Sequence, residues 1–464
     1  MIVMKFGGSS VANAERIRHV ADIIRGFADR RPVVVLSAMG DTTDDLLDAA
    51  DAALTGVITL DAIEKLHNTT AKELGIATTD VDALLSELRT LLTGISMLRE
   101  VTPRSRDYLV AFGERLSVRI MSAYLNSLNV RAEFRDAWDV GFISDSNYTS
   151  ADLLPETWEN IRKALGPYAA GKKGDGMAMP IVTGFIAKDE KGFITTLGRG
   201  GSDLTATIIG SALRVEEVQT WKDVDGILTT DPRIVKEART VPVATYDEVA
   251  ELAYFGAQVL HPRSMQPCLQ TGTPVRVKNS YNIDAPGSII VTSHEKAPSP
   301  VRAITTKKNV TLIDIVSTRM LGQYGFLATV IESFATHSIS VDVVATSEVS
   351  VSLTVDGKKA NLAGLRHDLE KYASIDIKKD KAIVTVICDV RRSSYILAAT
   401  FDVLARDNIN VQMISQGASK VNISMICESD EAERVVRLLH ESYFGKDGKG
   451  GFPIDGGLPP NGGR

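Results

Sequence analysis

Short apolar runs alternate with segments of helical periodicity through the first part of the chain. Residues 2–6, 32–36 and 180–186 are apolar on both faces, as strands are when both sides of a parallel sheet are covered. Residues 14–27 instead place their apolar side chains at helical spacing. The pattern predicts an α/β domain, a three-layer sandwich in which a mostly parallel sheet lies between helices.

A second pattern follows and occurs twice. The first copy has segments 310–315, 326–336, 339–344 and 349–355, and the second has 383–388, 396–405, 409–414 and 421–427. In each copy the order is strand, helix, strand, strand, with another helix after it. This order describes a small ferredoxin-like βαββαβ module, present twice.

The changes of pattern give the expected domain boundaries. Residues 1–296 form the first domain, and a linker rich in proline and charge ends it near residue 300. The two modules occupy residues 308–380 and 381–444. Residues 445–464 are rich in glycine and proline, so we expect a disordered tail.

Composition excludes several classes of protein. The 464 residues carry a net charge of −6 and show no basic run with interleaved aromatics, which argues against a nucleic-acid binder. No apolar run reaches membrane length, and the strand-like start leaves no room for a signal peptide. Cys268, Cys388 and Cys427 are scattered and odd in number, which indicates a reducing compartment. We expect a soluble protein, cytoplasmic in a bacterium, or in the plastid stroma of a photosynthetic eukaryote after removal of a transit peptide.

Candidate chemistry is concentrated in two glycine-rich loops. Residues 195–203 read Thr-Thr-Leu-Gly-Arg-Gly-Gly-Ser-Asp and join a predicted strand to a predicted helix. Glycines let the backbone approach a ligand, and a helix N-terminus favours an anion. Arg199 can hold a carboxylate through two parallel hydrogen bonds. Asp203 has two interpretations, a cap of the helix or a carboxylate that serves a metal or substrate, and the whole stretch also fits an ordinary glycine-rich cap.

The second loop follows Lys5 and contains Gly7 and Gly8. It differs from the common nucleotide-binding loop, because here the lysine precedes the glycines. A lysine inside an apolar strand is costly unless it faces a site, although a surface lysine beside a turn is the simpler alternative. In parallel sheets ligands bind beyond the carboxyl ends of the strands, so we expect the loops after residues 6, 36 and 197 to share one edge.

Other candidates are weaker when taken singly. Glu114 follows Gly113 on a predicted helix that can reach this edge, but a solvated or paired glutamate is the commoner case. Residues 222–233 carry two cations and three carboxylates after a strand, which suits a nucleotide and its metal ion and equally suits a solvated loop. His261 precedes Pro262, so we assign it a structural role.

Three segments together resemble the aspartate kinases: residues 5–11, 195–203 and 255–262. These enzymes are members of the amino-acid kinase family that carry a carboxy-terminal pair of ACT domains. The resemblance extends from residue 3 to about residue 444. Residues 221–226 and 341–351 are most similar to the lysine-sensitive enzymes of plants and related bacteria. No dehydrogenase domain follows, so the chain resembles the monofunctional form.

The resemblance implies phosphorylation of the β-carboxylate of L-aspartate by Mg-ATP, the first step towards lysine, threonine and methionine. It implies catalytic roles for Lys5, Arg199 and Asp203. The implied ATP contacts are Gly7, Gly8, Ser9, Lys222, Asp223, Gly226, Arg233 and Gln258. The implied aspartate contacts are Thr43, Glu114, Phe185, Arg199 and Ser202. Mg²⁺ is expected to be held through the ATP phosphates and not by protein ligands.

Two departures from the family pattern affect the nucleotide site. Some relatives carry tyrosine where Leu228 stands and lysine where Gln258 stands. Lys222 replaces a threonine in those relatives and can supply the missing positive charge.

The first ACT domain matches the family's lysine-binding positions at Met320, Phe326, Leu327, Asp342, Ser347 and Glu348. The resemblance therefore implies inhibition by lysine, with S-adenosylmethionine as a second candidate effector. ACT domains commonly pair edge to edge, which implies a homodimer or a dimer of dimers. The alternatives are a kinase for glutamate or acetylglutamate, and a catalytically dead amino-acid sensor.

Overall fold

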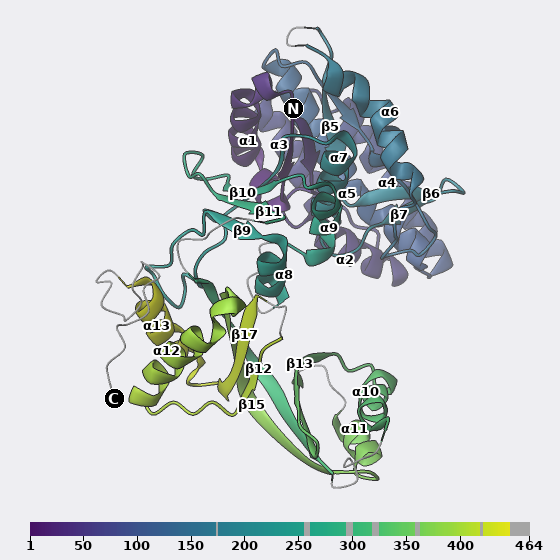
Figure 1. Cartoon of the computed structure of the whole chain (residues 1–464). Coiled ribbons are helices and arrows are strands. Elements are labelled where there is room, and N and C mark those ends of the chain that lie inside the picture. Colours follow the sequence, from purple (N-terminus) through teal and green to yellow (C-terminus); the bar gives the residue numbers. More distant parts are fainter. Residues whose placement is uncertain are drawn as a thin grey trace. The chain divides into compact units, whose positions relative to one another are not determined.

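The protein is described by a computed structural model that covers residues 1–172, 175–254, 260–293, 300–317, 324–357, 362–417 and 421–445. The chain divides into two compact units (Figure 1). The first unit is Met1–Ile227, Pro242–Tyr246 and Val259–Ser293, and the second is Leu228–Val241, Asp247–Gln258 and His294–Arg464. Two short segments before residue 260 thus belong to the second unit. The predicted single boundary near residue 296 does not account for them.

The first unit is built on an eight-stranded sheet with the order β3-β5-β2-β1-β8-β10-β11-β9. Its strands are β1 (Ile2–Phe6), β2 (Val33–Leu36), β3 (Ala132–Arg135), β5 (Met179–Thr183), β8 (Glu217–Lys222), β9 (Val243–Thr245), β10 (Val275–Asn279) and β11 (Ser288–Val291). The strands from β3 to β10 in this order are parallel, and β11 is antiparallel to β10. The prediction of a mostly parallel α/β sheet is confirmed.

Helices pack on the sheet, and the alternation of side chains along each strand determines which residues face these helices. Its helices are α1 (Ala14–Gly26), α2 (Thr42–Leu54), α3 (Asp61–Leu74), α4 (Thr79–Leu98), α5 (Pro103–Ser127), α6 (Glu156–Ala170), α7 (Gly201–Leu213) and α9 (Pro262–Thr271). Ile2, Met4 and Phe6 pack into one core with residues of α1 and α5. Because side chains alternate along a strand, Lys5 points to the opposite face, where α7 packs on β1. This placement brings a lysine into the buried layer beside α7.

A small second sheet lies beside the first, with the order β4-β6-β7. Its strands are β4 (Ile143–Ser144), β6 (Ile186–Asp189) and β7 (Ile194–Thr196), and the short helix η3 (Ala137–Val140) precedes it. The hairpin of β6 and β7 leads directly into the glycine loop before α7. Asp107 of α5 fixes its base, because its carboxylate accepts hydrogen bonds from Thr196 N at 3.0 Å and Thr196 Oγ1 at 2.8 Å.

The second unit holds a six-stranded sheet with the order β13-β14-β12-β15-β17-β16. Its elements are β12 (Val301–Val316), α10 (Phe326–Thr336), β13 (Val341–Thr346), β14 (Ser350–Asp356), α11 (Leu362–Leu369), β15 (Ser374–Cys388), α12 (Ser393–Arg406), β16 (Met413–Ser415), β17 (Asn422–Glu428) and α13 (Ala432–Phe444). Residues 247–254 of helix α8 (Tyr246–Tyr254) also belong to this unit. Two ferredoxin-like modules are present, as predicted.

The modules are nested and not simply consecutive. Strands β12 and β15 pair antiparallel along their length, from Val301 opposite Cys388 to Val316 opposite Ser374. One half of this long ribbon packs with α12 and α13, and the other half packs with α10 and α11. Residues 301–307, which precede the expected first module, therefore complete the sheet of the second module.

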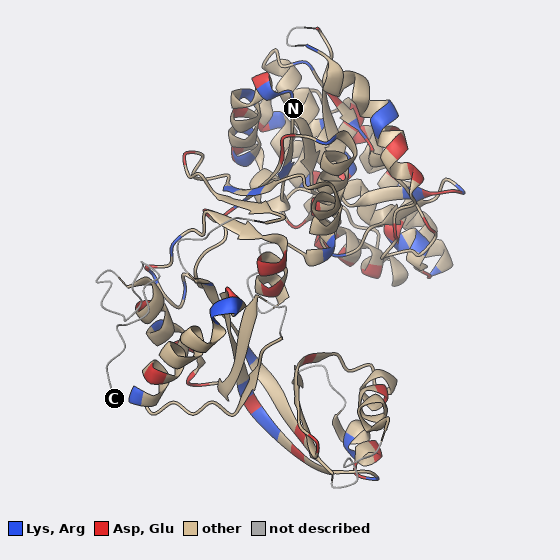
Figure 2. Ribbon diagram, viewed as in Figure 1, with Lys and Arg blue, Asp and Glu red and all other residues tan. Residues whose placement is uncertain are grey.

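Charges of both signs are spread over both units (Figure 2). In the described ranges, no helix is both long enough and apolar enough to cross a membrane.

Candidate active site

A buried ion pair joins the two glycine loops. Lys5 Nζ lies 2.8 Å from Asp203 Oδ1, and their side chains are only 8% and 10% exposed. Lys5 comes from β1, and Asp203 comes from the first turn of α7. The N-cap of α7 is Gly200, with a φ of 75° and no side-chain cap. The structure therefore excludes the cap interpretation of Asp203 and shows a buried carboxylate paired with a lysine.

Lys222 completes a cluster of three charges. It ends β8, the neighbour of β1, and its Nζ lies 3.7 Å from Asp203 Oδ2. Burial would raise the pKa of Asp203, but Lys5 and Lys222 outweigh burial and hold that pKa below its ordinary value. Burial, assisted by the charge of Lys5, lowers the pKa of Lys222. Two cations share one carboxylate, so the cluster has an excess of positive charge.

The loop after β1 lies against the loop after β2. Gly40 N donates a hydrogen bond to Gly8 O at 3.1 Å, and a Cβ at Gly8 would lie 2.8 Å from Ala38 O. A Cβ at Gly7 would lie 3.8 Å from Lys5 Nζ, so this loop passes directly by the ammonium group. Ser9 is exposed at the same loop. The loops after residues 6 and 36 thus meet at one edge of the sheet, as predicted.

Glu114 is buried at this edge on α5. Its Oε1 accepts a hydrogen bond from Ala38 N at 3.3 Å, while Oε2 is buried without a hydrogen-bond partner among the described residues. Gly113 allows the close approach, because a Cβ there would lie 2.7 Å from Ala38 Cβ. Burial raises the pKa of Glu114 to about 8, although Lys5 and backbone N–H groups oppose the shift. The alternative of a solvated glutamate is therefore wrong.

The glycine loop before α7 packs on the turn after β5. A Cβ at Gly184 would lie 2.6 Å from Ser202 Cβ, and a Cβ at Gly201 would lie 2.7 Å from Phe185 Cδ2. Phe185 adopts a φ of 70°, rare for a bulky residue, and its N–H donates to Thr205 Oγ1 at 3.1 Å. Ser202 is buried behind this turn. The structure thus brings Phe185 and Ser202 together.

Arg199 lies exposed in the same loop, and within the described residues its guanidinium has no hydrogen-bond partner. Burial and the positive charges of Arg199 and Arg263 lower the pKa of His261, while Asp203 opposes this effect. His261 caps α9, since its Nδ1 accepts a hydrogen bond from Arg263 N at 3.3 Å. The charges of Arg199 and Asp203 therefore both affect the pKa of the His261 imidazole.

Thr43 is half-buried in the first turn of α2, after the loop that follows β2.

The loop after β10 was missed by sequence reasoning. Asn279 and Asn282 donate hydrogen bonds to Asp225 Oδ1 at 2.8 and 3.1 Å, which fixes the turn after β8. Ser280 N donates to Lys222 O at 2.8 Å, and the guanidinium of Arg16 lies 4.1 Å from the centre of the Tyr281 ring. The rule that parallel strands end at one edge could have identified this loop, because the alternating apolar residues of 275–279 are typical of a strand.

The structure places the other residues predicted to bind the nucleotide in different parts of the chain. Asp223 is exposed and Gly226 takes a φ of 116° in the turn after β8. Arg233 belongs to the second unit, where it is exposed and paired with Asp231 at 2.6 Å. Gln258 lies outside the described residues.

The candidate regulatory residues lie in the second unit. Asp342 of β13 is already engaged, because Lys307 Nζ lies 2.6 Å from its Oδ2 and Tyr254 Oη donates to its Oδ1 at 3.0 Å. Phe326 and Leu327 begin α10, and Ser347 and Glu348 are exposed in the turn before β14. Met320 lies outside the described residues.

Comparison with known proteins agrees with this architecture. The amino acid kinase family matches residues 1–279, and the ACT domain matches residues 313–364 and 384–443. Aspartokinase 2, chloroplastic, of Arabidopsis thaliana is 51% identical, over 96% of this chain and 84% of that protein. Two structures of Escherichia coli aspartokinase III are similar. The complex with lysine and aspartate has a TM-score of 0.77 and 30% identity, over 96% of this chain and 99% of that one. The complex with aspartate and ADP has a TM-score of 0.76 and 31% identity, over 95% and 99%.

The chain belongs to the aspartokinase family. Aspartokinases transfer a phosphoryl group from ATP to the side-chain carboxylate of aspartate, and the predicted identification, fold and kinase activity are confirmed. The part of the chain that the amino acid kinase family matches includes Lys5, Glu114, Arg199 and Asp203.

Proposed function

We propose that Lys5, Asp203 and Lys222 form the phosphoryl-transfer centre of this aspartokinase. The observation that carries the proposal is the buried cluster in which two ammonium groups share one carboxylate beside a glycine loop. Excess positive charge in a site of low dielectric favours a polyphosphate. Gly7, Gly8 and Ser9 offer backbone and hydroxyl donors at the same place.

The chemistry needs little from the protein beyond position and charge. Free aspartate has a side-chain pKa of about 3.9, so its β-carboxylate is ionised at neutral pH and needs no general base. A carboxylate oxygen forms a bond to the γ-phosphorus while the bond to the leaving oxygen of ADP breaks, and ADP keeps the electron pair. Lys5 neutralises charge on the transferred group, and Asp203 holds Lys5 in place.

The aspartate site lies between the two loops. Arg199 is exposed, and its guanidinium, which makes no hydrogen bond to the described residues, can bind the α-carboxylate through paired hydrogen bonds. Glu114 Oε2 is buried and has no hydrogen-bond partner in the described part of the chain, which suits the ammonium group of the substrate. Phe185, Ser202 and Thr43 line this site in the proposal. Escherichia coli aspartokinase III has been solved with aspartate bound.

The nucleotide enters as Mg-ATP, and bound Mg²⁺ neutralises charge on the β- and γ-phosphates. The excess positive charge of the lysine cluster fits these phosphates. Lys222 ends β8, Asp223 and Gly226 lie on the turn that follows, and the loop after β10 supports that turn. Arg233 and Gln258 remain proposed contacts of the nucleotide on the family pattern alone.

Lysine is the proposed inhibitor, with a coupling free energy of roughly 1–3 kcal/mol between the ACT site and catalysis. Asp342 and Glu348 carry the charge that a cationic amino acid needs, and Met320, Phe326, Leu327 and Ser347 complete the proposed site. Escherichia coli aspartokinase III has been solved with lysine. In this chain the ammonium of lysine would compete with Lys307 for Asp342.

Three further proposals rest on the family pattern. ACT domains are expected to pair the chain into a homodimer or a dimer of dimers, and S-adenosylmethionine is a candidate second effector. We place the enzyme in the plastid stroma if the source is a photosynthetic eukaryote, where the Arabidopsis relative is named chloroplastic, and in the cytoplasm if it is bacterial.

A coupled assay of ADP release tests the proposal. Aspartate is expected to support turnover and glutamate is not. Turnover with glutamate alone would indicate a different amino-acid kinase, and no ADP release with either substrate would indicate a sensor that has lost catalysis. Titration of lysine in the same assay tests the regulatory proposal separately, since catalysis without lysine inhibition would contradict only that part.

A further inference from the structure

The first unit contains a hollow whose lining does not include Lys5, Asp203 or Lys222. It has a volume of about 520 Å³ and lies between α4, α5, η3 and the β6–β7 hairpin. Leu91, Trp138, Phe193 and Ile194 give it apolar walls, and Arg104 and Lys188 stand among them. Ligand sites typically have volumes of 300–1,000 Å³, with apolar walls and a few polar groups. The hollow has the size and lining of a small-molecule site.

Its charges are not balanced. Lys188 Nζ lies 4.3 Å from the centre of the Trp138 ring, and the guanidinium carbon of Arg104 lies 4.6 Å from the centre of the Phe193 ring. Neither cation has a carboxylate within ion-pair distance in the described part of the chain. The other cation of the hollow, Arg115, is paired with Glu87 at 3.1 Å. Both positive charges thus lie beside aromatic rings without an ion pair in the described ranges, although Asp139 lies close enough for its charge to interact with Lys188.

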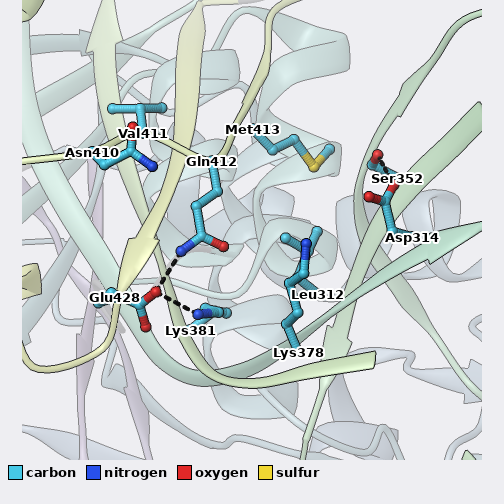
Figure 3. Close-up of a pocket in the computed structure, with 10 residues that line it drawn as sticks. All are labelled: Leu312, Asp314, Ser352, Lys378, Lys381, Asn410, Val411, Gln412, Met413 and Glu428. Carbon is cyan, nitrogen blue, oxygen red and sulfur yellow. Dashed lines mark hydrogen bonds and ion pairs between the residues drawn. The ribbon is translucent and has the colours of Figure 1, made fainter. Parts of the chain in front are cut away.

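A hollow in the second unit provides a contrast. It has a volume of about 540 Å³ and is lined by strands of both modules (Figure 3). There Lys381 is paired with Glu428 at 2.5 Å, and Asp314 accepts a hydrogen bond from Ser352 Oγ (Figure 3). Its polar groups largely satisfy one another, so they do not specify a ligand. The hollow beside α4 and α5 differs, because Arg104 and Lys188 form no ion pair with any residue that the structure describes.

The same hollow is connected to the proposed aspartate site by two rigid elements. On α5, Arg115 lines the hollow while the adjacent Glu114 is buried beside Ala38. On the β6–β7 hairpin, Ile194 lines the hollow, and Thr196 is fixed to α5 by Asp107. The chain then enters the glycine loop that carries Arg199. A ligand that shifts the hairpin against α5 would therefore move the groups proposed to bind aspartate.

We propose that this hollow is a second ligand site of the kinase unit. It binds a small organic anion that carries one carboxylate, sulfonate or phosphate group on a planar or apolar body. The anionic group pairs with Arg104 and Lys188, and the body packs against Trp138, Phe193 and Leu91. Occupancy changes the affinity for aspartate through α5 and the hairpin. This effector site is separate from the proposed lysine site of the second unit.

Calorimetric titration with naphthalene-2-sulfonate tests the site, with the uncharged 2-naphthalenesulfonamide as the matched probe. The full chain is expected to bind the sulfonate at least tenfold more tightly than the sulfonamide. The double variant Arg104→Gln/Lys188→Gln is expected to weaken sulfonate binding at least tenfold. The variant Lys65→Gln/Lys72→Gln changes the net charge equally on exposed positions of α3 and is expected to bind as the natural chain does.

Several outcomes would overturn the proposal. Equal loss of binding in both double variants would show a general charge effect, and unchanged binding in both would place the probe elsewhere. Absence of binding to the natural chain at millimolar probe would also overturn it. A changed sedimentation coefficient of Arg104→Gln/Lys188→Gln, with probe binding intact, would identify the hollow as a subunit contact.

The coupling is tested by titrating aspartate with and without saturating sulfonate. The dissociation constant for aspartate is expected to change at least threefold in the natural chain and not in Arg104→Gln/Lys188→Gln. An unchanged constant in the natural chain would contradict the coupling. Since probe binding is measured without turnover, its failure is distinguishable from failure of the proposed kinase mechanism.

Discussion

Lys5 Nζ and Asp203 Oδ1 lie 2.8 Å apart in a layer that excludes most solvent. The pair connects the first strand of the sheet to the first turn of α7, so the positions of both glycine loops depend on it. Removing one partner of a buried pair typically costs about 3–5 kcal/mol, because the other charge remains buried. Catalytic geometry and folding stability are therefore linked at this point.

Asp203→Asn keeps the shape of the side chain and removes its charge. We expect kcat to fall on the order of a hundredfold, because Lys5 loses the group that orients it and faces Lys222 directly. The urea midpoint of unfolding is also expected to fall. Asp51→Asn, at an exposed position of α2, serves as the control and is expected to change neither quantity. An Asp203→Asn enzyme with normal kcat would remove Asp203 from the mechanism.

Glu114→Gln tests the proposed ammonium site. We expect the KM for aspartate to rise at least tenfold and the KM for ATP to change little. The pKa of Glu114 is raised to about 8, so the carboxyl is largely protonated at neutral pH in the empty enzyme. The KM for aspartate should accordingly fall as pH rises from about 6.5 to 8 in the natural chain, and this trend should be weaker in the variant. Identical pH profiles would contradict the assignment.

The raised pKa of Glu114 also affects the free energy of unfolding. Between the ordinary glutamate pKa and about 8, the folded chain holds a proton that the unfolded chain has lost. This group's contribution to the free energy of unfolding therefore decreases as pH rises through that window. Glu114→Gln is expected to remove the decrease, so the variant gains stability relative to the natural chain towards pH 8. Denaturant unfolding at pH 5 and pH 8 measures this, and a constant difference between the two proteins would be the contrary result.

Lys222→Ala is expected to affect the KM values of the two substrates differently. Because Lys222 ends β8 directly before the turn that we assign to the nucleotide, the KM for ATP should rise more than the KM for aspartate. Steady-state kinetics with each substrate varied in turn decide this. A larger effect on aspartate would rule out the nucleotide role.

Lys307→Met tests the competition proposed at Asp342. The variant removes the ammonium group that occupies this carboxylate, so we expect half-inhibition at a lower lysine concentration. Asp342→Asn and Glu348→Lys should instead weaken inhibition. A Glu348→Lys enzyme that kept full lysine sensitivity would contradict the assigned site, and unchanged inhibition in Lys307→Met would remove the competition.

Much of the site could be predicted because its signals are local. A lysine in an apolar strand requires a partner, and the strand–glycine–helix order places Lys5 and Asp203 at one edge of a parallel sheet. The partner itself was not predictable from periodicity, since Asp203 fits a cap equally well. Only the packing of α7 on β1 shows that Asp203 pairs with Lys5 and does not cap the helix.

The predictions were weaker where distant segments share an element. The two halves of β12 belong to different modules, and no local pattern marks the change within one strand. Arg233 and residues 247–254 precede the linker but belong to the second unit. Lys307 and Tyr254 reach Asp342 from other elements, so its sequence neighbours gave no sign that the carboxylate is already paired.

The most direct test of the central claim is the rate of aspartate-dependent ADP release by Lys5→Ala, measured beside the natural chain and an exposed-site control, Lys65→Ala. The account predicts at least a hundredfold lower kcat for Lys5→Ala and normal rates for the control. A Lys5→Ala enzyme that releases ADP at the natural rate would contradict the assignment of the buried lysine cluster as the phosphoryl-transfer centre.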